Sequence, residues 1–242
     1  MLRPLHFLTL ATLLSGSAAL GRDTVAVARS RPLPEEGPAR LPHVAPESAG
    51  MNVSRLAMID DVVLQGIRAG GFPGAAVIVA RHGGIVWERG YGNLDWQSGV
   101  AVDPERTMYD LASLTKIVAT TAASMVLVDH GKLRLDGRVT HYLPAFSGGA
   151  KDQVTIRDLL THRSGLPAGR DISRGAGPEA ARKAVLATSL VREPGSGYEY
   201  SDLGLDVMGF IIETITHEPL DQFVRHAVYA PLGMRSTMFR PA

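Results

Sequence analysis

A long apolar segment with one amine near its start constrains this chain more than any other feature. It runs roughly from Ser113 to His130, and Gly131 follows as a helix C-cap. Nearly all of its residues are apolar or small, so we expect a helix that is buried on most sides. Lys116 falls in the first turn, where burial would lower the pKa of its amine. A buried lysine at this position needs a polar partner.

The spacing of Ser113 and Lys116 provides such a partner. Side chains three residues apart lie on one face of a helix and can approach within hydrogen-bond reach. A serine hydroxyl becomes a useful nucleophile when a neighbouring base accepts its proton. The positive end of the helix would also favour negative charge that develops beside Ser113. The pattern alone is weak, because a serine helix cap followed by a solvated lysine has the same sequence.

The region before this segment predicts a helix followed by a β-hairpin. Apolar residues recur at helical spacing from Leu56 to Ile67, and Ser54 is a suitable N-cap. Small and β-branched residues occupy 74–80, and a second strand-like run covers 85–91. The turn residues His82-Gly83-Gly84 separate the two runs, as expected for a hairpin.

The region after it predicts a group of helices. Thr155 and Asp158 form a variant of the capping box at the start of one of them. Pro219 suits the first position of another. The expected helices cover residues 155–162, 178–190, 203–216 and 219–230.

The N-terminal region differs in composition from the rest of the chain. Residues 1–21 combine a short basic start, a short apolar run and a small-residue exit, which predicts a secretory signal peptide. Residues 22–45 are rich in proline and predict a tether or a wrapped extended segment. We expect the folded domain to cover residues 46–242.

The net charge, the absence of cysteine and the spacing of the histidines argue against several classes of function. The net charge is +1, which gives no electrostatic reason to expect nucleic acid as a partner. The absence of cysteine removes disulfides, thiolate zinc sites, cysteine nucleophiles and a lipoprotein anchor, so no stable membrane anchor is expected. The eight histidines show no metal-ligand spacing, and neither a metal nor an organic cofactor is expected. The oligomeric state stays open.

The residues around Ser113 resemble a known family. Leu111-Ala112-Ser113-Leu114-Thr115-Lys116 is similar to the active-site motif of class C β-lactamases, D-alanyl-D-alanine carboxypeptidases and related esterases. Further similar segments occur in the family's order over roughly residues 45–240. They are Phe72-Pro73-Gly74-Ala75-Ala76-Val77, Tyr91-Gly92, Gly131-Lys132-Leu133-Arg134-Leu135-Asp136, residues 155–166 and Pro231-Leu232-Gly233-Met234.

The resemblance implies a fold for residues 46–242. This is an α/β (α+β) fold of the β-lactamase/transpeptidase type, in which an antiparallel sheet is flanked by helices and carries an all-helical lobe. The family's third motif, Lys-Thr-Gly or His-x-Gly on a late strand, is not found at its expected place. We therefore expect the C-terminal sheet strands to be missing. The hypothesis is a truncated gene product or one part of a longer protein.

The family's second motif, Tyr-x-Asn, has its best match at Tyr200-Ser201-Asp202. The resemblance assigns Tyr200 the role of sharing the serine proton with Lys116, and nearby positive charge favours a phenolate. Tyr198 is a competitor, but the residues after it do not fit the motif. A core tyrosine before a helix is the alternative interpretation of Tyr200.

Asp202 departs from the family's asparagine at a substrate-binding position. An ionised carboxylate accepts hydrogen bonds, whereas the amide can also donate one to a substrate carbonyl. Asp202 could instead pair with Lys116 and raise the pKa of its amine. The departure argues against a dedicated β-lactamase and favours an esterase or peptidase-like member.

The resemblance implies a serine hydrolase that forms an acyl-enzyme at Ser113, with Lys116 and Tyr200 as the other catalytic residues. Its substrate would be an ester, an amide, a β-lactam or a D-alanyl peptide, thus a small molecule or a peptidoglycan peptide. With the signal peptide, the protein would be exported to the periplasm or secreted. Two alternatives stay open: an inactive relative that binds cell-wall peptides, and a non-functional truncated product.

Overall fold

The computed structural model describes residues 40–171 and 177–241. The expected signal peptide over residues 1–21 lies outside the described residues, as does most of the tether over 22–45. The last residues of that tether are described. Pro42 and Val44 form backbone hydrogen bonds with Ile85, so these last residues lie along the strand that contains Ile85.

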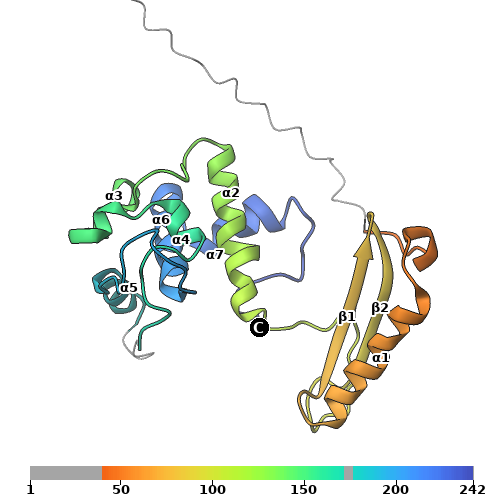
Figure 1. Cartoon of the computed structure of the whole chain (residues 1–242). Coiled ribbons are helices and arrows are strands. Elements are labelled where there is room, and N and C mark those ends of the chain that lie inside the picture. Colours follow the sequence, from red (N-terminus) through yellow and green to blue (C-terminus); the bar gives the residue numbers. More distant parts are fainter. Residues whose placement is uncertain (1–39, 172–176, 242) are drawn as a thin grey trace, which may run out of the picture. The chain divides into compact units, whose positions relative to one another are not determined.

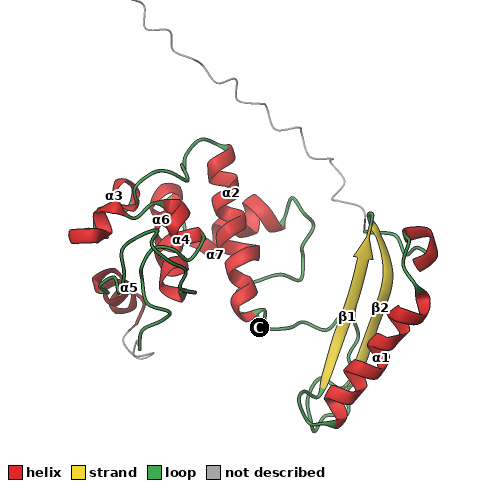
Figure 2. Cartoon of the chain, in the orientation of Figure 1, coloured by secondary structure: helices red, strands yellow, loops and turns green. Residues whose placement is uncertain are grey.

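The first part of the described chain is one helix and a β-hairpin (Figures 1 and 2). Helix α1 spans Val53–Arg68 and is followed by strands β1 (Gly74–Arg81) and β2 (Gly84–Gly92). The strands pair antiparallel with an irregularity between Val79 and Ala80, and the expected hairpin is confirmed.

The N-cap expected at Ser54 is wrong. Asn52 caps α1, because its side chain accepts a hydrogen bond from the backbone N–H of Arg55 at 2.9 Å. Ser54 is already the second residue of the helix. Both residue types are good caps, so periodicity alone left this boundary uncertain by two residues.

A small hydrophobic cluster joins α1 to β2. Its buried residues are Ala49, Leu56 and Val86, and partly buried apolar residues pack around them. Asp60 of α1 adds polar contacts, because it accepts a hydrogen bond from the Tyr91 hydroxyl at 2.8 Å. The helix is thus fixed to one strand of the sheet.

The second part of the described chain is helical. A 3₁₀ turn over Ala112–Leu114 continues through Thr115 into a π-helical segment and then into α2. The further helices follow in chain order. These segments are π-helical Lys116–Thr121, α2 Ala122–Asp129, α3 Val139–Tyr142, α4 Ile156–Leu160, α5 Gly177–Ala187, α6 Asp202–Thr216, α7 Leu220–Val224 and π-helical Arg225–Tyr229, with a 3₁₀ turn over Gly149–Gln153. Another 3₁₀ turn, Pro46–Ala49, precedes α1 in the first part.

Helix α6 is the centre of this helical part. It packs against α3, α4, α5, α7 and the π-helical segment that begins at Lys116. Met208, Ile211 and Ile212 are fully buried at helical spacing, in one core with residues of the surrounding helices. Because α6 is fixed on many sides, its N-terminus is a well-supported position for functional side chains.

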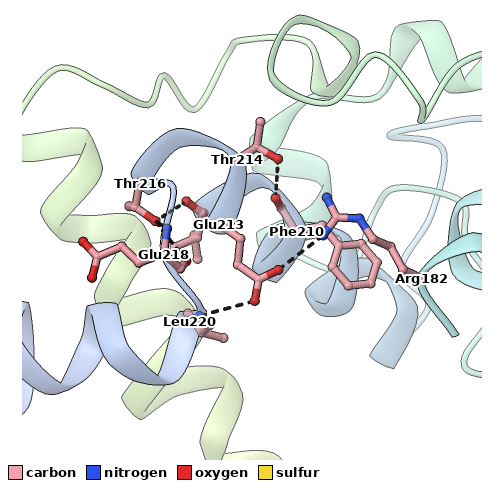
Figure 3. Close-up of polar contacts among 8 residues, drawn as sticks. Arg182, Phe210, Glu213, Thr214, Thr216, Glu218 and Leu220 are labelled. Carbon is pink, nitrogen blue, oxygen red and sulfur yellow. Dashed lines mark hydrogen bonds and ion pairs between the residues drawn. The ribbon is translucent and has the colours of Figure 1, made fainter. Parts of the chain in front are cut away.

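Polar contacts hold α5 and the start of α7 to α6 (Figure 3). Arg182 of α5 lies 3.2 Å from Oε2 of Glu213, and its guanidinium covers the ring of Phe210. Oε1 of Glu213 accepts a hydrogen bond from the backbone N–H of Leu220 at 3.3 Å. One carboxylate therefore connects three helices.

Two expectations about the apolar segment need correction. The segment is not a regular α-helix throughout, since 3₁₀ and π-helical turns precede α2. It is also not buried on most sides of the described structure. Ala119, Ala123 and Leu127 face the core, whereas Ile117 and Met125 are 61% and 67% exposed.

The same segment, Ala112–Asp129, has the length and apolarity of a membrane-spanning helix, with a mean hydropathy of 1.3 and 28% of its residues buried. Length and composition are weak criteria here, because the core helix of a soluble protein meets them too.

Candidate active site

Ser113 lies in a short turn with an unusual backbone. The preceding residue, Ala112, has a φ of 42°, and its N–H donates to Oδ1 of Asp110 at 2.8 Å. Residues other than glycine rarely adopt this left-handed region, and such strain concentrates at functional sites. The strained residue is the one immediately before the hydroxyl that the sequence singled out.

Lys116 connects Ser113 to the N-terminus of α6. Its Nζ donates a hydrogen bond to Oγ of Ser113 at 3.0 Å and lies 2.7 Å from Oδ1 of Asp202. The Lys116 side chain is 16% exposed, whereas that of Asp202 is 61% exposed. The lysine is therefore enclosed between two polar partners, with the carboxylate on the solvent side.

The expected lowering of the Lys116 pKa is wrong. Burial does act to lower this pKa, but hydrogen bonds to Asp202 and Tyr200 and their negative charge outweigh it, so that the pKa is raised above its ordinary value. This is the alternative that the sequence left open, in which Asp202 pairs with the amine and raises its pKa. Lys116 is an ammonium group at neutral pH.

Tyr200 completes the group of polar side chains. Nζ of Lys116 lies 5.1 Å from the centroid of the Tyr200 ring. Hydrogen bonds from Ser113 and Lys116, together with the positive charge of the lysine, hold the Tyr200 pKa below its ordinary value. The structure thus brings Ser113, Lys116, Tyr200 and Asp202 together, and the phenolate of Tyr200 is stabilised relative to that of an ordinary tyrosine.

The turn after α4 supports the segment that carries Tyr200 and Asp202. The hydroxyl of Ser201 donates to the carbonyl of Pro167 at 2.7 Å and accepts from the N–H of Gly204 as the N-cap of α6. The N–H of Asp202 donates to the carbonyl of Ala168 at 2.8 Å. These contacts fix the start of α6 against residues 162–168.

Sequence analysis missed His162, which the pattern placed among residues of a helix and turn beneath the site. Its Nδ1 accepts a hydrogen bond from the N–H of Ser201 at 3.1 Å. Burial, and then the charge of Lys116, hold the His162 pKa below the ordinary histidine value. Its position within the matched segment 155–166 was the available signal.

No cluster of three or more histidine, cysteine or carboxylate side chains suited to a metal occurs within residues 40–171 and 177–241. The polar groups at Ser113 are a hydroxyl, an ammonium, a phenol and one carboxylate. This donor set suits proton transfer and nucleophilic attack.

Solved structures that resemble this chain define its fold class. Among solved structures, EstCE1, a hydrolase with promiscuous acyltransferase activity, matches with a TM-score of 0.65 and 30% identity over 72% of this chain and 50% of that chain. A class C β-lactamase matches with a TM-score of 0.64 and 25% identity over 74% and 48%. The fold is therefore that of the β-lactamase and penicillin-binding-protein class, which confirms the expected α/β architecture.

The family follows from the sequence. Residues 59–242 match the family described as Beta-lactamase, and the chain belongs to this family. "Putative D-alanyl-D-alanine carboxypeptidase" of Escherichia coli (strain K12) is 33% identical over 221 residues, which cover 83% of this chain and 51% of that protein. A protein of the same name from Salmonella typhi is also 33% identical, over 223 residues. The chain spans about half the length of these curated relatives.

Proposed function

We propose that this chain carries the nucleophile of a serine hydrolase that works through an acyl-enzyme at Ser113. The observation that carries the proposal is the contact of Lys116 Nζ with Ser113 Oγ at 3.0 Å, next to a phenol with a lowered pKa. Membership of a hydrolase family supports the same reaction class.

The charges of the site suggest how the proton moves. Lys116 is held as an ammonium by Asp202, so it donates to Oγ of Ser113 and has no lone pair to accept a proton. Tyr200, as phenolate, accepts the proton from Ser113 while Oγ attacks the substrate carbonyl carbon. Lys116 then acts on Tyr200 electrostatically, because its positive charge favours the phenolate.

The atoms balance over two half-reactions. In the first, the bond from Oγ to the acyl carbon forms, the bond to the leaving group breaks, and the leaving alcohol or amine takes the proton from Tyr200. In the second, water attacks the acyl carbon, gives its proton to Tyr200 and releases the acid. The serine then recovers its proton. The backbone N–H of Ser113 is proposed to stabilise the oxyanion.

The proposed substrates are esters, amides or D-alanyl peptides, including β-lactams. Asp202 supports an ester or a peptide over a dedicated β-lactam substrate, because a carboxylate does not donate a hydrogen bond to the substrate carbonyl. The names of the two curated relatives support a D-alanyl peptide. Action on such peptides would take place outside the cytoplasm, in keeping with the signal peptide that the sequence predicts.

Covalent labelling tests the proposal. The chain is incubated with a fluorophosphonate or a fluorescent penicillin, and the adduct is located by mass spectrometry. We expect the label on Ser113 and no label in Ser113→Ala. The matched control is Ser196→Ala, which removes an exposed hydroxyl from the loop before Tyr200 and keeps the label. Equal labelling of Ser113→Ala and the wild type would rule the proposal out.

A second candidate is a relative that binds cell-wall peptides without turnover. The ion pair of Lys116 with Asp202 supports it, because a lysine held as an ammonium at neutral pH does not act as a base. This candidate requires that purified peptidoglycan retains the chain equally before and after Ser113→Ala, with no hydrolysis of any ester by the wild type.

A further inference from the structure

His162 forms hydrogen bonds with the backbone of both residues that flank Tyr200 in the sequence. Its carbonyl accepts a hydrogen bond from the N–H of Glu199 at 2.9 Å, and its Nδ1 accepts one from the N–H of Ser201 at 3.1 Å. The two residues that flank Tyr200 are therefore bound to the same histidine. No other residue among those described by the structure makes both of these contacts.

The imidazole ring also contacts the phenol ring. The two ring centroids are 4.5 Å apart with an interplanar angle of 32°, which is an offset, tilted stack. Tyr198 approaches the imidazole on its edge, with centroids 6.0 Å apart. The position of the Tyr200 ring is thus limited by the ring of His162 as well as by the backbone.

The backbone of His162 is adapted to this role. Its φ is 56°, in the left-handed region that residues other than glycine rarely adopt. This conformation follows directly after α4 and the C-cap Thr161. A strained backbone persists where the surrounding structure fixes it, and here it lets one residue present both its carbonyl and its ring to the 199–201 segment.

We infer that His162 is a positioning residue for Tyr200, and that it acts only as the neutral imidazole with its proton on Nε2. Nδ1 must keep its lone pair to accept the N–H of Ser201, and protonation of Nδ1 places two donors against each other. The inference extends the proposed function, because it concerns the group that takes the proton from Ser113.

The charged and titratable groups around His162 set the pH range in which its imidazole is neutral. The ammonium of Lys116 and the carboxylate of Asp202 face it from two elements, and the phenols of Tyr198 and Tyr200 face its ring. Burial and the Lys116 charge keep its pKa below the ordinary histidine value. The neutral form therefore prevails at neutral pH and is lost on acidification through that lowered pKa.

Two substitutions separate the hydrogen bond from the ring stack. His162→Asn keeps an acceptor, Oδ1, at the same number of bonds from the backbone as Nδ1, and asparagine tolerates a left-handed φ. His162→Phe keeps an aromatic ring but removes the acceptor. A role limited to filling space predicts that phenylalanine is the better replacement, whereas the positioning role predicts asparagine.

The test follows the titration of Tyr200 by NMR of ¹³Cζ-labelled tyrosine, with the signal assigned from Tyr200→Phe. We expect the low pKa of Tyr200 to persist in His162→Asn and to rise towards the free-phenol value in His162→Phe. Labelling of Ser113 by the fluorophosphonate should fall about 100-fold in His162→Phe, and much less in His162→Asn. An unchanged Tyr200 titration in a folded His162→Phe chain overturns the inference.

A second measurement uses the wild-type chain alone. The amide ¹⁵N shift of Ser201 should change with pH in step with the ¹⁵N shifts of the His162 ring, and Nδ1 should carry no proton at neutral pH. A ring protonated on Nδ1 at neutral pH overturns the inference even where a variant fails to fold. If the Tyr200 titration moves as expected but Ser113 is never labelled, the positioning role holds and the proposed function fails.

Discussion

Nζ of Lys116 lies closer to Oδ1 of Asp202, at 2.7 Å, than to Oγ of Ser113, at 3.0 Å. The carboxylate therefore stabilises the charged form of the amine, and the Lys116 pKa is raised although burial acts to lower it. In the proposed mechanism, this contact decides which group serves as the base. It favours the phenol of Tyr200, whose pKa is lowered by hydrogen bonds from Ser113 and Lys116.

Replacing this carboxylate should move the pH dependence of acylation. In Asp202→Asn, Lys116 loses the negative partner that raises its pKa, and Tyr200 loses a negative charge that raises its own. Either group then reaches its basic form at lower pH. We expect the rising limb of the labelling rate to shift to lower pH.

The measurement is the rate of fluorophosphonate labelling as a function of pH. Asp206→Asn is the control, since it removes a carboxylate one turn further along α6 that forms no ion pair with Lys116. It should give a smaller shift. A limb that stays in place, or moves to higher pH, in Asp202→Asn would contradict the assigned ion pair.

Removing the phenol should remove both the titration and the reaction. The Tyr200→Phe variant lacks the proton acceptor, so labelling of Ser113 should fall by about 10²–10⁴-fold. Absorbance at the phenolate band should also lose the tyrosine that ionises below the ordinary range. Tyr198→Phe removes a neighbouring exposed phenol and should leave both readouts in place. If the two variants label equally, Tyr200 is not the acceptor.

The capping box of α4 offers a test of stability. Oγ1 of Thr155 accepts the N–H of Asp158 at 3.1 Å and donates to Oδ2 of the same residue at 2.6 Å. Thr155→Ala removes both bonds and should lower the free energy of unfolding by about 1 kcal/mol. Thr155→Ser retains the hydroxyl and should lose much less. Urea denaturation followed by circular dichroism measures the difference, and equal losses would show that the cap contributes nothing.

The turn that supports the site depends on Gly165, where φ is +83°. A Cβ at this position would lie 2.2 Å from the carbonyl oxygen of Arg192. Gly165→Ala therefore adds a steric clash to the cost of a left-handed alanine, which alone is about 1–2 kcal/mol. Gly131→Ala is the matched control, since its φ is +68° and a Cβ there meets nothing within 4 Å.

Thermal unfolding of the two alanine variants isolates the clash. We expect Gly165→Ala to be clearly less stable than Gly131→Ala, and labelling of Ser113 to fall along with it because the turn carries His162. Equal melting temperatures would mean that the Arg192 carbonyl moves aside freely.

Much of the fold was predictable because its signals are local. The runs of residues 74–80 and 85–91 and the turn between them predicted the hairpin, and Thr155 with Asp158 predicted the start of α4. The errors arose where two local choices were similar in energy or where burial was decisive. Ser54 and Asn52 are both good helix caps, and the apolar segment after Ser113 could not reveal that Ile117 would be exposed.

The same distinction between local signals and tertiary packing applies to the candidate site. The sequence by itself predicted that Ser113 and Lys116 face each other, because side chains three residues apart in a helical turn lie on one face. Only the tertiary structure decided that Asp202 takes the amine of Lys116 and that His162 holds the segment of Tyr200. Charge interactions and hydrogen bonds depend on distances through space, and packing α4 and α6 together sets those distances between residues far apart in the chain.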